Sequence, residues 1–443
     1  MAAPALPAPR RAAIVPMPPV ASGRLPWIGS GRRLLRDPTG FFAETRRRLG
    51  DTYVVDAFGR RLLCVFSAAG VKALYALPEQ QASFGVATYN LLRLKIPGEL
   101  FQGRRNTPRT LFGNSEVERY LQALDDAVAA QMDELGCGGT FEVFAEMRRL
   151  GHRLGFASWI GSVATAPRWL DRLIPLFDRI DSADAFVRPA QAFRTAITRH
   201  RRERRAMHGL ERVVAAIRVE MGVEPDPDGD FLARLYASYA DLPEPERDPA
   251  VARDVIMLHL GSQSNLYAAL AWTFINVITR PDIAARVRDG DDALLEQCAN
   301  ESIRLGQRSI TLRQVLQPIA LADERRTYRI EPGVLVATML SVNNTTAAPG
   351  LEGFDPAHYD GRRLAASVSL PARELVSTFG HGSHSCPAQR FVISAVRTAV
   401  GHLLARYDFE PRFTAATPRV RQLGAVARAA EPCVVAYRKR ACA

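Results

Sequence analysis

The sequence predicts a mainly α-helical protein with a small β portion. Apolar residues recur at helical spacing through most of residues 117–305, whereas strand patterns are confined to a few short segments nearer the two ends. The composition, with 47% hydrophobic and 23% charged residues, is that of a globular chain with a sizeable core. Because no repeat or abrupt change in composition divides the 443 residues, we expect one domain over residues 23–443 behind a flexible lead-in over residues 1–22.

Local signals predict the individual elements. Asp37 is a suitable cap for a helix that runs to Leu49. Two strand-like runs, Tyr53–Ala57 and Leu62–Phe66, are separated by Phe58-Gly59-Arg60-Arg61 and predict a β-hairpin. Residues 82–113 show poor periodicity and predict a long loop. Further helices are expected at Val117–Leu135, Phe141–Ile160, Pro167–Ile180, Pro189–Val219, Phe231–Tyr239, Pro249–Thr279, Pro281–Val287 and Ala293–Leu305. Shorter strands are expected around Ile319 and at Tyr328–Ile330, Val334–Met339, Val420–Ala425 and Cys433–Tyr437.

Charge and cysteine usage argue against several classes of protein. The 58 Lys and Arg residues outnumber the 46 Asp and Glu residues, but the excess is spread along the chain without a nucleic-acid motif, so we expect no nucleic-acid partner. The six cysteines are scattered without CxxC pairs, which indicates neither a disulfide framework nor a zinc site and fits a reducing, cytoplasmic location. No apolar run reaches the length that a bilayer requires, so the sequence predicts no membrane span.

One segment combines glycine, histidine and cysteine in a way that indicates chemistry. It runs Phe379-Gly380-His381-Gly382-Ser383-His384-Ser385-Cys386-Pro387, and a helical pattern follows. Gly380 and Gly382 let the backbone turn closely around whatever Cys386 holds, and the proline suits the first helical position. Cys386 is then the cap residue of a helix, where the helix dipole and Arg390 favour the thiolate. A thiolate is a nucleophile or a metal ligand, whereas a lone cysteine is more often a buried structural residue.

This segment resembles the haem-binding loop of the cytochrome P-450 superfamily, Phe-Gly-x-Gly-x-His/Arg-x-Cys-x-Gly. The resemblance implies a cytochrome P-450 fold with haem b (iron protoporphyrin IX) as cofactor. It also implies Cys386 as the axial ligand of the iron, with Phe379, Gly380 and Gly382 in the loop that holds the sulfur. One position departs from the pattern, because the glycine expected two residues after the cysteine is Ala388.

Two further segments match the superfamily. Glu301-Ser302-Ile303-Arg304 places a carboxylate and a guanidinium on one helix face, although Glu-x-x-Arg by itself is commonly a surface pair. An aromatic and arginine-containing segment, from Phe354 to Arg363, follows before the cysteine loop. The resemblance implies that Glu301, Arg304 and Arg363, or less favourably Arg362, form a buried structural cluster behind the haem loop.

The resemblance also implies partners for the two haem propionates. Arg313 lies on the strand where the superfamily places an arginine that pairs with one propionate, and His384 is expected to pair with the other. The Trp-x-x-x-Arg often found on an early helix is missing. Its arginine is then Arg104, Arg105 or Arg109, and the sequence does not choose among them.

The helix expected across the distal face of the haem departs from the common pattern. Many oxygen-activating members carry an acid and an alcohol there, as Ala-Gly-x-Asp/Glu-Thr, whereas this chain reads Gly261-Ser262-Gln263-Ser264-Asn265-Leu266-Tyr267. Asn265 takes the position of the acid and Leu266 that of the alcohol. An amide does not titrate near neutral pH and a leucine relays no proton, so the usual proton pathway is absent.

Protons would then come from Ser262, Gln263 or an ordered water. The competing interpretation is that Gln263 and Asn265 only make hydrogen bonds along the helix groove. The segment, with Trp272 after it, looks like that of the branch containing sterol 7α-hydroxylase and prostacyclin synthase. That branch includes oxygen-using hydroxylases and an isomerase, so the resemblance leaves the chemistry open.

The function expected from the resemblance is that of a haem-thiolate monooxygenase. It would oxidise a hydrophobic small molecule in specialised metabolism (biosynthesis), with electrons from a ferredoxin and a ferredoxin reductase. The alternative is an isomerase, dehydratase or nitrene-type transferase whose substrate carries its own O–O or N–O bond, and the replacements at positions 265 and 266 motivate it. A haem-free thiol enzyme and a haem sensor are the other classes. The pocket walls are expected from residues 82–100, 181–192, 258–266 and 309–310.

Overall fold

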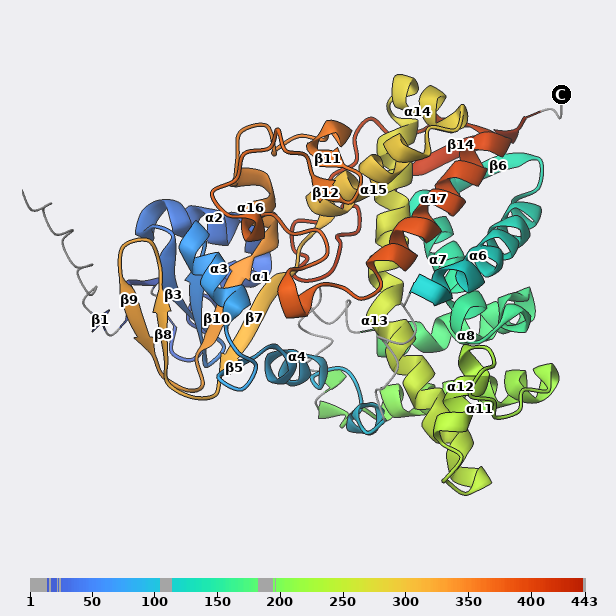
Figure 1. The fold of residues 1–443 in the computed structure, drawn as a ribbon, viewed down its shortest axis with the longest axis horizontal. Helices are drawn as coiled ribbons and strands as arrows, with labels where there is room; N and C mark the ends of the chain where they lie inside the picture. The colour runs from blue at the N-terminus through green and yellow to red at the C-terminus, as the bar shows by residue number, and fades with distance from the viewer. Residues whose placement is uncertain are drawn as a thin grey trace, which may run out of the picture.

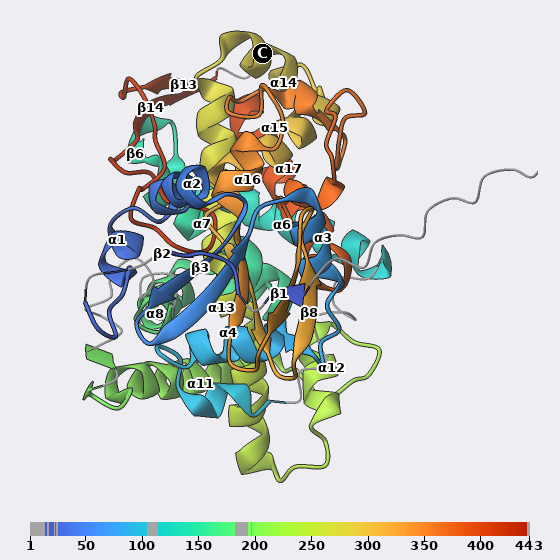
Figure 2. The same cartoon turned by 90° about the vertical axis from the view of Figure 1, so that its left-hand side faces the viewer.

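The computed structural model describes residues 14–440, apart from residues 16, 22, 24, 104–113, 182–193 and 196. It confirms the mainly α-helical class with a small β portion. The β-rich part lies on one side, most helices lie on the other, and α13 (Glu244–Ile278) passes between them (Figure 1). Seen from the β-rich side, α2 and α16 lie at one end of the main sheet and α4 at the other (Figure 2).

The other helices are α1 (Gly31–Arg36), α2 (Pro38–Leu49), α3 (Ala68–Ala76), α4 (Phe84–Leu92), α6 (Asn114–Leu135), α7 (Val143–Trp159), α8 (Pro167–Ile180), α11 (Arg201–Met221), α12 (Phe231–Ser238), α14 (Pro281–Arg288), α15 (Asp292–Gly306), α16 (Leu340–Thr346) and α17 (Gln389–Arg406). Short 3-10 turns are η1 (Gly98–Phe101), η2 (Ser162–Thr165), η3 (Pro356–His358), η4 (Arg373–Leu375) and η5 (Gly382–His384). The strands are β1 (Ile14–Val15), β2 (Val20–Ala21), β3 (Thr52–Ala57), β4 (Arg60–Val65), β5 (Ala82–Ser83), β6 (Gly138–Glu142), β7 (Ile310–Val315), β8 (Ile319–Ala322), β9 (Thr327–Ile330), β10 (Leu335–Met339), β11 (Tyr359–Asp360), β12 (Arg363–Leu364), β13 (Tyr407–Pro411) and β14 (Val434–Lys439).

The main sheet joins segments that are far apart in the sequence. Its strand order is β2-β3-β4-β10-β7-β5, with β10 parallel to β4 and antiparallel to β7. The predicted hairpin is confirmed as β3 and β4, but its connection is shorter than expected because Arg60 and Arg61 belong to β4. The two-residue turn, Phe58-Gly59, has φ angles of 52° and 70°, as a turn that matches the strand twist requires. This sheet fixes β7, which carries one of the predicted site residues, Arg313.

The central helix α13 is buried by its neighbours. It packs against α7, α15, α11 and α17, and every residue from Leu266 to Ile275 is buried. A helix stretch that is apolar on all sides is stable only inside a protein, so this half of α13 forms the centre of the large core. No described helix is long and apolar enough to cross a membrane.

Several expectations need correction. Residues 82–92 do not form a loop, because Ser83 accepts a hydrogen bond from Val86 N–H and caps α4. The strand expected at 420–425 is wrong, since Gly424 and Ala425 have φ angles of 98° and 58°, which no strand accommodates. The described parts of residues 1–22 pair as β1 with β9 and β2 with β3. The first part of the helix expected from Pro189 lies outside the described residues.

Candidate active site

The cysteine loop is closed by its own backbone. Cys386 N–H donates to the carbonyl of Phe379 at 2.6 Å, and Gly380 N–H donates to Ser377 Oγ at 3.0 Å. Gly380 has a φ angle of 82°, and a Cβ added there would lie 2.3 Å from the carbonyl oxygen of His384. Only glycine therefore fits at this position, and the tight turn carries Cys386 at its end.

The start of the following helix differs from the expectation. Helix α17 begins at Gln389 with Ala388 as its cap residue, so Cys386 stands two residues before the cap and is not itself the cap. Burial raises the pKa of the Cys386 thiol, and a hydrogen bond from the Ala388 backbone opposes this only in part. The exposed Arg390 does not reverse the direction. Deprotonation of this sulfur would thus depend on what binds to it, as it does for any thiol that coordinates a metal.

The two residues expected at the propionates lie together. Arg313 is 1% exposed, donates to the Ala82 carbonyl at 2.9 Å and also to the Leu77 carbonyl, and touches His384 Nε2 with a terminal nitrogen. Burial lowers the pKa of Arg313, and burial together with the nearby guanidinium lowers the pKa of His384. The Arg313 Nε atom is buried without a hydrogen-bond partner. A guanidinium in this state is prepared to donate to an acceptor.

The four distal residues expected on α13 do not share one face. Gln263 and Leu266 are buried, and Leu266 packs within the large core. Ser262 is partly exposed, and its hydroxyl donates to the His259 carbonyl at 3.1 Å. Asn265 is exposed. Leu266, which takes the position of the alcohol in the family pattern, is turned into the core by the helix and lies on another side of it than the exposed Asn265.

A segment near the C-terminus is fastened to α13. Asn265 Oδ1 accepts a hydrogen bond from Val426 N–H at 2.9 Å, and Trp272 Nε1 donates to the Ala427 carbonyl at 2.5 Å. Val426 also forms a β-bridge with Gln307, whose side chain donates to the Thr378 carbonyl at 3.4 Å. The segment therefore connects α13 to the base of the cysteine loop. Sequence reasoning missed Val426 and Gln307, since neither carries a local signal.

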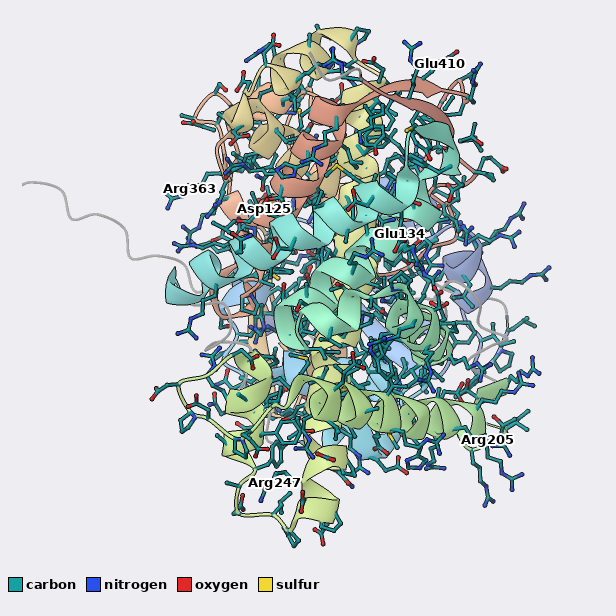
Figure 3. All side chains as sticks on the ribbon, turned by 90° about the vertical axis from the view of Figure 1, so that its right-hand side faces the viewer. Asp125, Glu134, Arg205, Arg247, Arg363 and Glu410 are labelled. Carbon is teal, nitrogen blue, oxygen red and sulfur yellow. The ribbon has the colours of Figure 1, made fainter. Side chains whose placement is uncertain are left out.

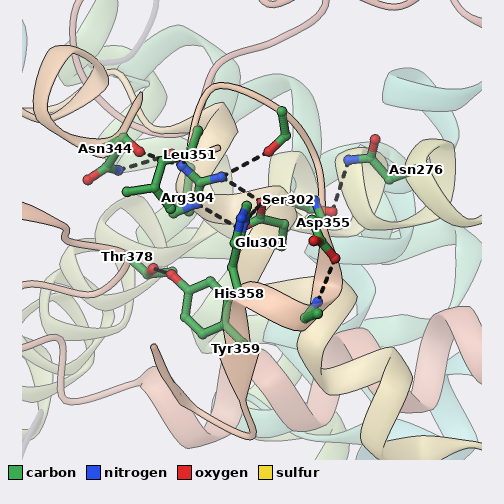
Figure 4. Close-up of polar contacts among 12 residues, drawn as sticks. Asn276, Glu301, Ser302, Arg304, Asn344, Leu351, Asp355, His358, Tyr359 and Thr378 are labelled. Atoms are coloured by element: carbon green, nitrogen blue, oxygen red, sulfur yellow. Dashed lines mark hydrogen bonds and ion pairs between the residues drawn. The ribbon is translucent and has the colours of Figure 1, made fainter. Parts of the chain in front are cut away.

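Glu301 and Arg304 form a completely buried ion pair on α15 (Figure 4). Arg304 donates to Glu301 through two nitrogens, at 2.6 and 2.5 Å, and to the Leu351 carbonyl at 2.7 Å. His358 Nδ1 donates to the same carboxylate at 2.9 Å. A buried charge pair is tolerated only when its remaining hydrogen-bonding capacity is used, and here the surrounding carbonyls and His358 use it.

The expectation for Arg363 is corrected by the structure. Its side chain is exposed on β12 and projects away from the protein (Figure 3), so it takes no part in the cluster. The hairpin of β11 and β12 pairs Asp360 with Arg363 and directs the arginine outward. Arg362 binds Glu296 at 2.9 Å. His358, five residues before Arg363 in the same aromatic segment, takes the third place in the cluster.

Polar contacts link this cluster to the cysteine loop. The Asn344 side chain donates to the Ser377 carbonyl at 3.0 Å and accepts from Ser377 N–H at 2.8 Å. Asn344 is fully buried, and its carbonyl accepts from Arg304. Tyr359 bonds to the Thr378 hydroxyl. The residues just before the turn at Gly380 are thus held in place by the buried ion pair.

The early arginines, Arg104, Arg105 and Arg109, lie outside the described residues, as does most of the expected pocket wall at 181–192.

Comparisons with known proteins find cytochromes P450. The Cytochrome P450 family matches residues 178–435. The chain is 19% identical to Cytochrome P450 7B1 of Mus musculus, over 89% of this chain and 84% of the relative. It is 25% identical to Cytochrome P450 monooxygenase pyr3 of Aspergillus fumigatus over 53% of this chain and 48% of that protein. Identity to Putative cytochrome P450 137 of Mycobacterium tuberculosis is 26%, over 46% of this chain and 43% of the relative.

Proposed function

The chain belongs to the cytochrome P450 family of haem-thiolate monooxygenases, and we propose that it hydroxylates an apolar small molecule of specialised metabolism with haem b as cofactor. The observation that carries the proposal is the arrangement around the cysteine loop. The partly exposed thiol of Cys386 sits at the end of a tight turn that only glycine can make, and a buried guanidinium and an imidazole meet beside it.

These residues fit a haem. Cys386 is the sulfur that would hold the iron, and Arg313 and His384 would hold the propionates. The unpartnered Nε of Arg313 supports this assignment, since a buried N–H without an acceptor is costly and a carboxylate would satisfy it. When bound, the haem supplies the oxygen-activating chemistry, and a thiolate ligand favours O–O cleavage. Phe379, with its carbonyl on Cys386 N–H, keeps the sulfur in position.

An apolar substrate is supported by the open face of α13. Along this face Leu258 and Ser262 are partly exposed, and Gly261 and Asn265 are exposed. A Cβ added at Gly261 would meet nothing within 4 Å, so there is space beside the helix. None of these four residues is charged, so the face offers little to a charged substrate, and ligand pockets with few polar groups select apolar molecules.

Electrons would come from a separate ferredoxin and its reductase. The net charge of +12 favours an acidic partner. Arg390, four residues after Cys386, is exposed and is the better candidate for docking, because Arg397 is paired with Asp292 at 2.5 Å. Reversal of the Arg390 charge should raise the KM for ferredoxin. Unchanged turnover would count against this docking face.

The location and extent of the enzyme are part of the same proposal. We take residues 23–443 as one catalytic domain that works in the cytoplasm. The described cysteines are all free thiols, which supports a reducing compartment.

The decisive experiment is the absorption spectrum of the reduced, carbon-monoxide-bound protein. A haem-thiolate centre gives a strongly red-shifted Soret band, which Cys386→His should abolish while haem remains bound. Colourless wild-type protein that takes up no added haemin, or a wild-type band typical of imidazole ligation, would overturn the proposal.

A second measurement separates the two kinds of catalysis. A monooxygenase needs dioxygen and electrons for every turnover. The isomerase, dehydratase or nitrene-type alternative predicts turnover of a substrate with its own O–O or N–O bond under anaerobic conditions without a reductant. The relatives named as monooxygenases favour the first outcome.

A further inference from the structure

The open face of α13 carries one side-chain amide among small or apolar residues and a serine whose hydroxyl is already bonded. One side of the helix carries the positions i, i+3, i+4 and i+7, and these are Leu258, Gly261, Ser262 and Asn265, each at least partly exposed. The Ser262 hydroxyl already donates to a backbone carbonyl of its own helix. The amide of Asn265 is then the group on this face with donor capacity to spare.

The orientation of the Asn265 amide is fixed by what it binds. Its Oδ1 accepts the backbone N–H of Val426 at 2.9 Å. A rotation that exchanged the two ends would set Nδ2 against that N–H, so two donors would face each other and a hydrogen bond would be lost. The oxygen therefore stays on Val426, and Nδ2 is directed to the other side. Among the residues that the structure describes, none accepts a hydrogen bond from Nδ2.

The backbone that fixes this amide is itself held on several sides. Gln422 donates from its side chain to the Val426 carbonyl at 3.1 Å, and its Oε1 accepts from Arg428 N–H at 3.0 Å. Ala427 N–H donates to the Gly306 carbonyl at 2.8 Å, and Trp272 binds the Ala427 carbonyl. Val426 is 3% exposed. Because this segment has little freedom, the Asn265 amide is a preorganised donor, and preorganisation is what makes a single hydrogen bond useful in binding.

We propose that Asn265 selects the substrate of this enzyme by donating a hydrogen bond from Nδ2 to an acceptor oxygen on an otherwise apolar molecule. The proposal rests on the proposed function and narrows its substrate class to oxygenated apolar compounds, such as ketones, ethers or alcohols. Asn265 is thus a specificity residue with two hydrogen bonds. One is made with the protein and sets its orientation, and the other is made with the substrate.

Aspartate at this position separates the two hydrogen bonds. Asn265→Asp keeps an oxygen for Val426 N–H and has no N–H to donate, whereas Asn265→Ala removes both capacities. Asn276→Asp is the matched control. It makes the same change on the same helix, where Asn276 binds Ser302 at 3.0 Å and lies next to Arg280 at 3.2 Å, away from the open face.

The test is a binding measurement on the haem-loaded protein. Ketones and their parent hydrocarbons (adamantan-2-one with adamantane, cyclododecanone with cyclododecane) are titrated, and binding is read from the shift of the ferric Soret band. The wild type and Asn276→Asp should bind the ketones about five- to tenfold more tightly than the hydrocarbons, as one neutral hydrogen bond allows. Asn265→Asp should bind the two members of each pair alike. Hydrogen exchange at Val426 should stay slow in Asn265→Asp and become faster in Asn265→Ala.

Three results would overturn the inference. In the first, no ketone binds the wild type more tightly than its hydrocarbon. In the second, Asn265→Asp keeps the preference. In the third, the preference disappears together with fast exchange at Val426 in Asn265→Asp, which would mean that Asn265 acts only through that segment. A normal haem-thiolate spectrum with any of these results overturns this inference alone, whereas the absence of that spectrum overturns the proposed function.

Discussion

Behind the cysteine loop, Glu301 and Arg304 are fully buried and bonded to each other, to backbone carbonyls and to His358, whereas on α13 Gly261 and Asn265 remain exposed. The first region has charged groups in a dry interior, where each must be satisfied in one arrangement. The second has small residues and a single oriented amide. The difference teaches that satisfied buried charges fix one arrangement of the chain, whereas small exposed residues leave space beside α13. Under the proposed function, the first supports the loop that holds the haem and the second leaves room for the substrate.

The largest effect should follow from opening the buried ion pair. Glu301→Ala leaves Arg304 as an uncompensated buried charge, which costs about 3–5 kcal/mol. We expect a loss of this size in the free energy of unfolding, measured by denaturant titration, together with weaker haem retention. If the variant is as stable as the wild type, the cluster does not support the loop.

The next effect tests whether His358, and not Arg363, is the third member of the buried cluster. His358→Ala removes a hydrogen bond to a buried carboxylate and should cost about 1.5–3 kcal/mol of unfolding free energy. Arg363→Ala, as the matched control in the same segment, should change it by less than about 0.5 kcal/mol because the side chain is exposed. Equal losses in the two variants would contradict the placement of His358 in the cluster.

A third effect comes from two buried histidines where α7 packs against α13, His152 on α7 and His259 on α13. Trp159 Nε1 donates to His259 Nδ1 at 3.1 Å, so the His259 proton is on Nε2 and is donated to His152 Nδ1 at 2.8 Å. Burial lowers the pKa of His259 to about 3 and lowers that of His152. Below about pH 6.5 the unfolded chain binds protons at these groups that the folded chain does not. The free energy of unfolding should therefore decrease as the pH is lowered, by about 1.4 kcal/mol per pH unit for each histidine.

Chemical unfolding between pH 7.5 and pH 5 measures this slope. His259→Phe keeps a ring between its aromatic neighbours and should lower stability at pH 7.5, yet it should flatten the decline below pH 6.5. His402→Gln, at a partly exposed site on α17, is the control and should leave the slope unchanged. A slope that His259→Phe does not alter would show that this pair is not titrating.

The smallest effect sharpens the description of the open face. Trp272→Phe removes the hydrogen bond to the Ala427 carbonyl and should cost about 1 kcal/mol. The loss should appear as faster hydrogen exchange over residues 424–428, with the buried cluster of Glu301 unchanged. Exchange that accelerates equally in both regions would mean that the two are one cooperative unit.

Much of this protein follows from local sequence signals. Asp37 caps α2 by accepting from Gly40 N–H at 2.8 Å, and α8 has the bounds that its apolar periodicity predicts. The predictions of secondary structure were wrong where contacts between residues distant in the sequence decide the conformation. Helix α4 was missed because Gly85, in its first turn, breaks the helical sequence pattern. The segment over residues 420–425 has a strand-like composition but forms a bent connection, because Gly306, Gln307 and Arg308 pair with its end and with the residues that follow. Local patterns report the conformation that a segment prefers, whereas pairing partners and bends depend on the rest of the chain.

The sequence by itself determined the family, the cysteine loop and the chemical types of the site residues, because glycine, cysteine and arginine at fixed spacing carry these properties within a few residues. Only the tertiary structure decided that His358 replaces Arg363 in the cluster, that Leu266 points into the core, and that Asn265 is oriented by Val426. These outcomes depend on which side of a helix or hairpin meets a distant segment, and burial and hydrogen bonding across that contact settle them.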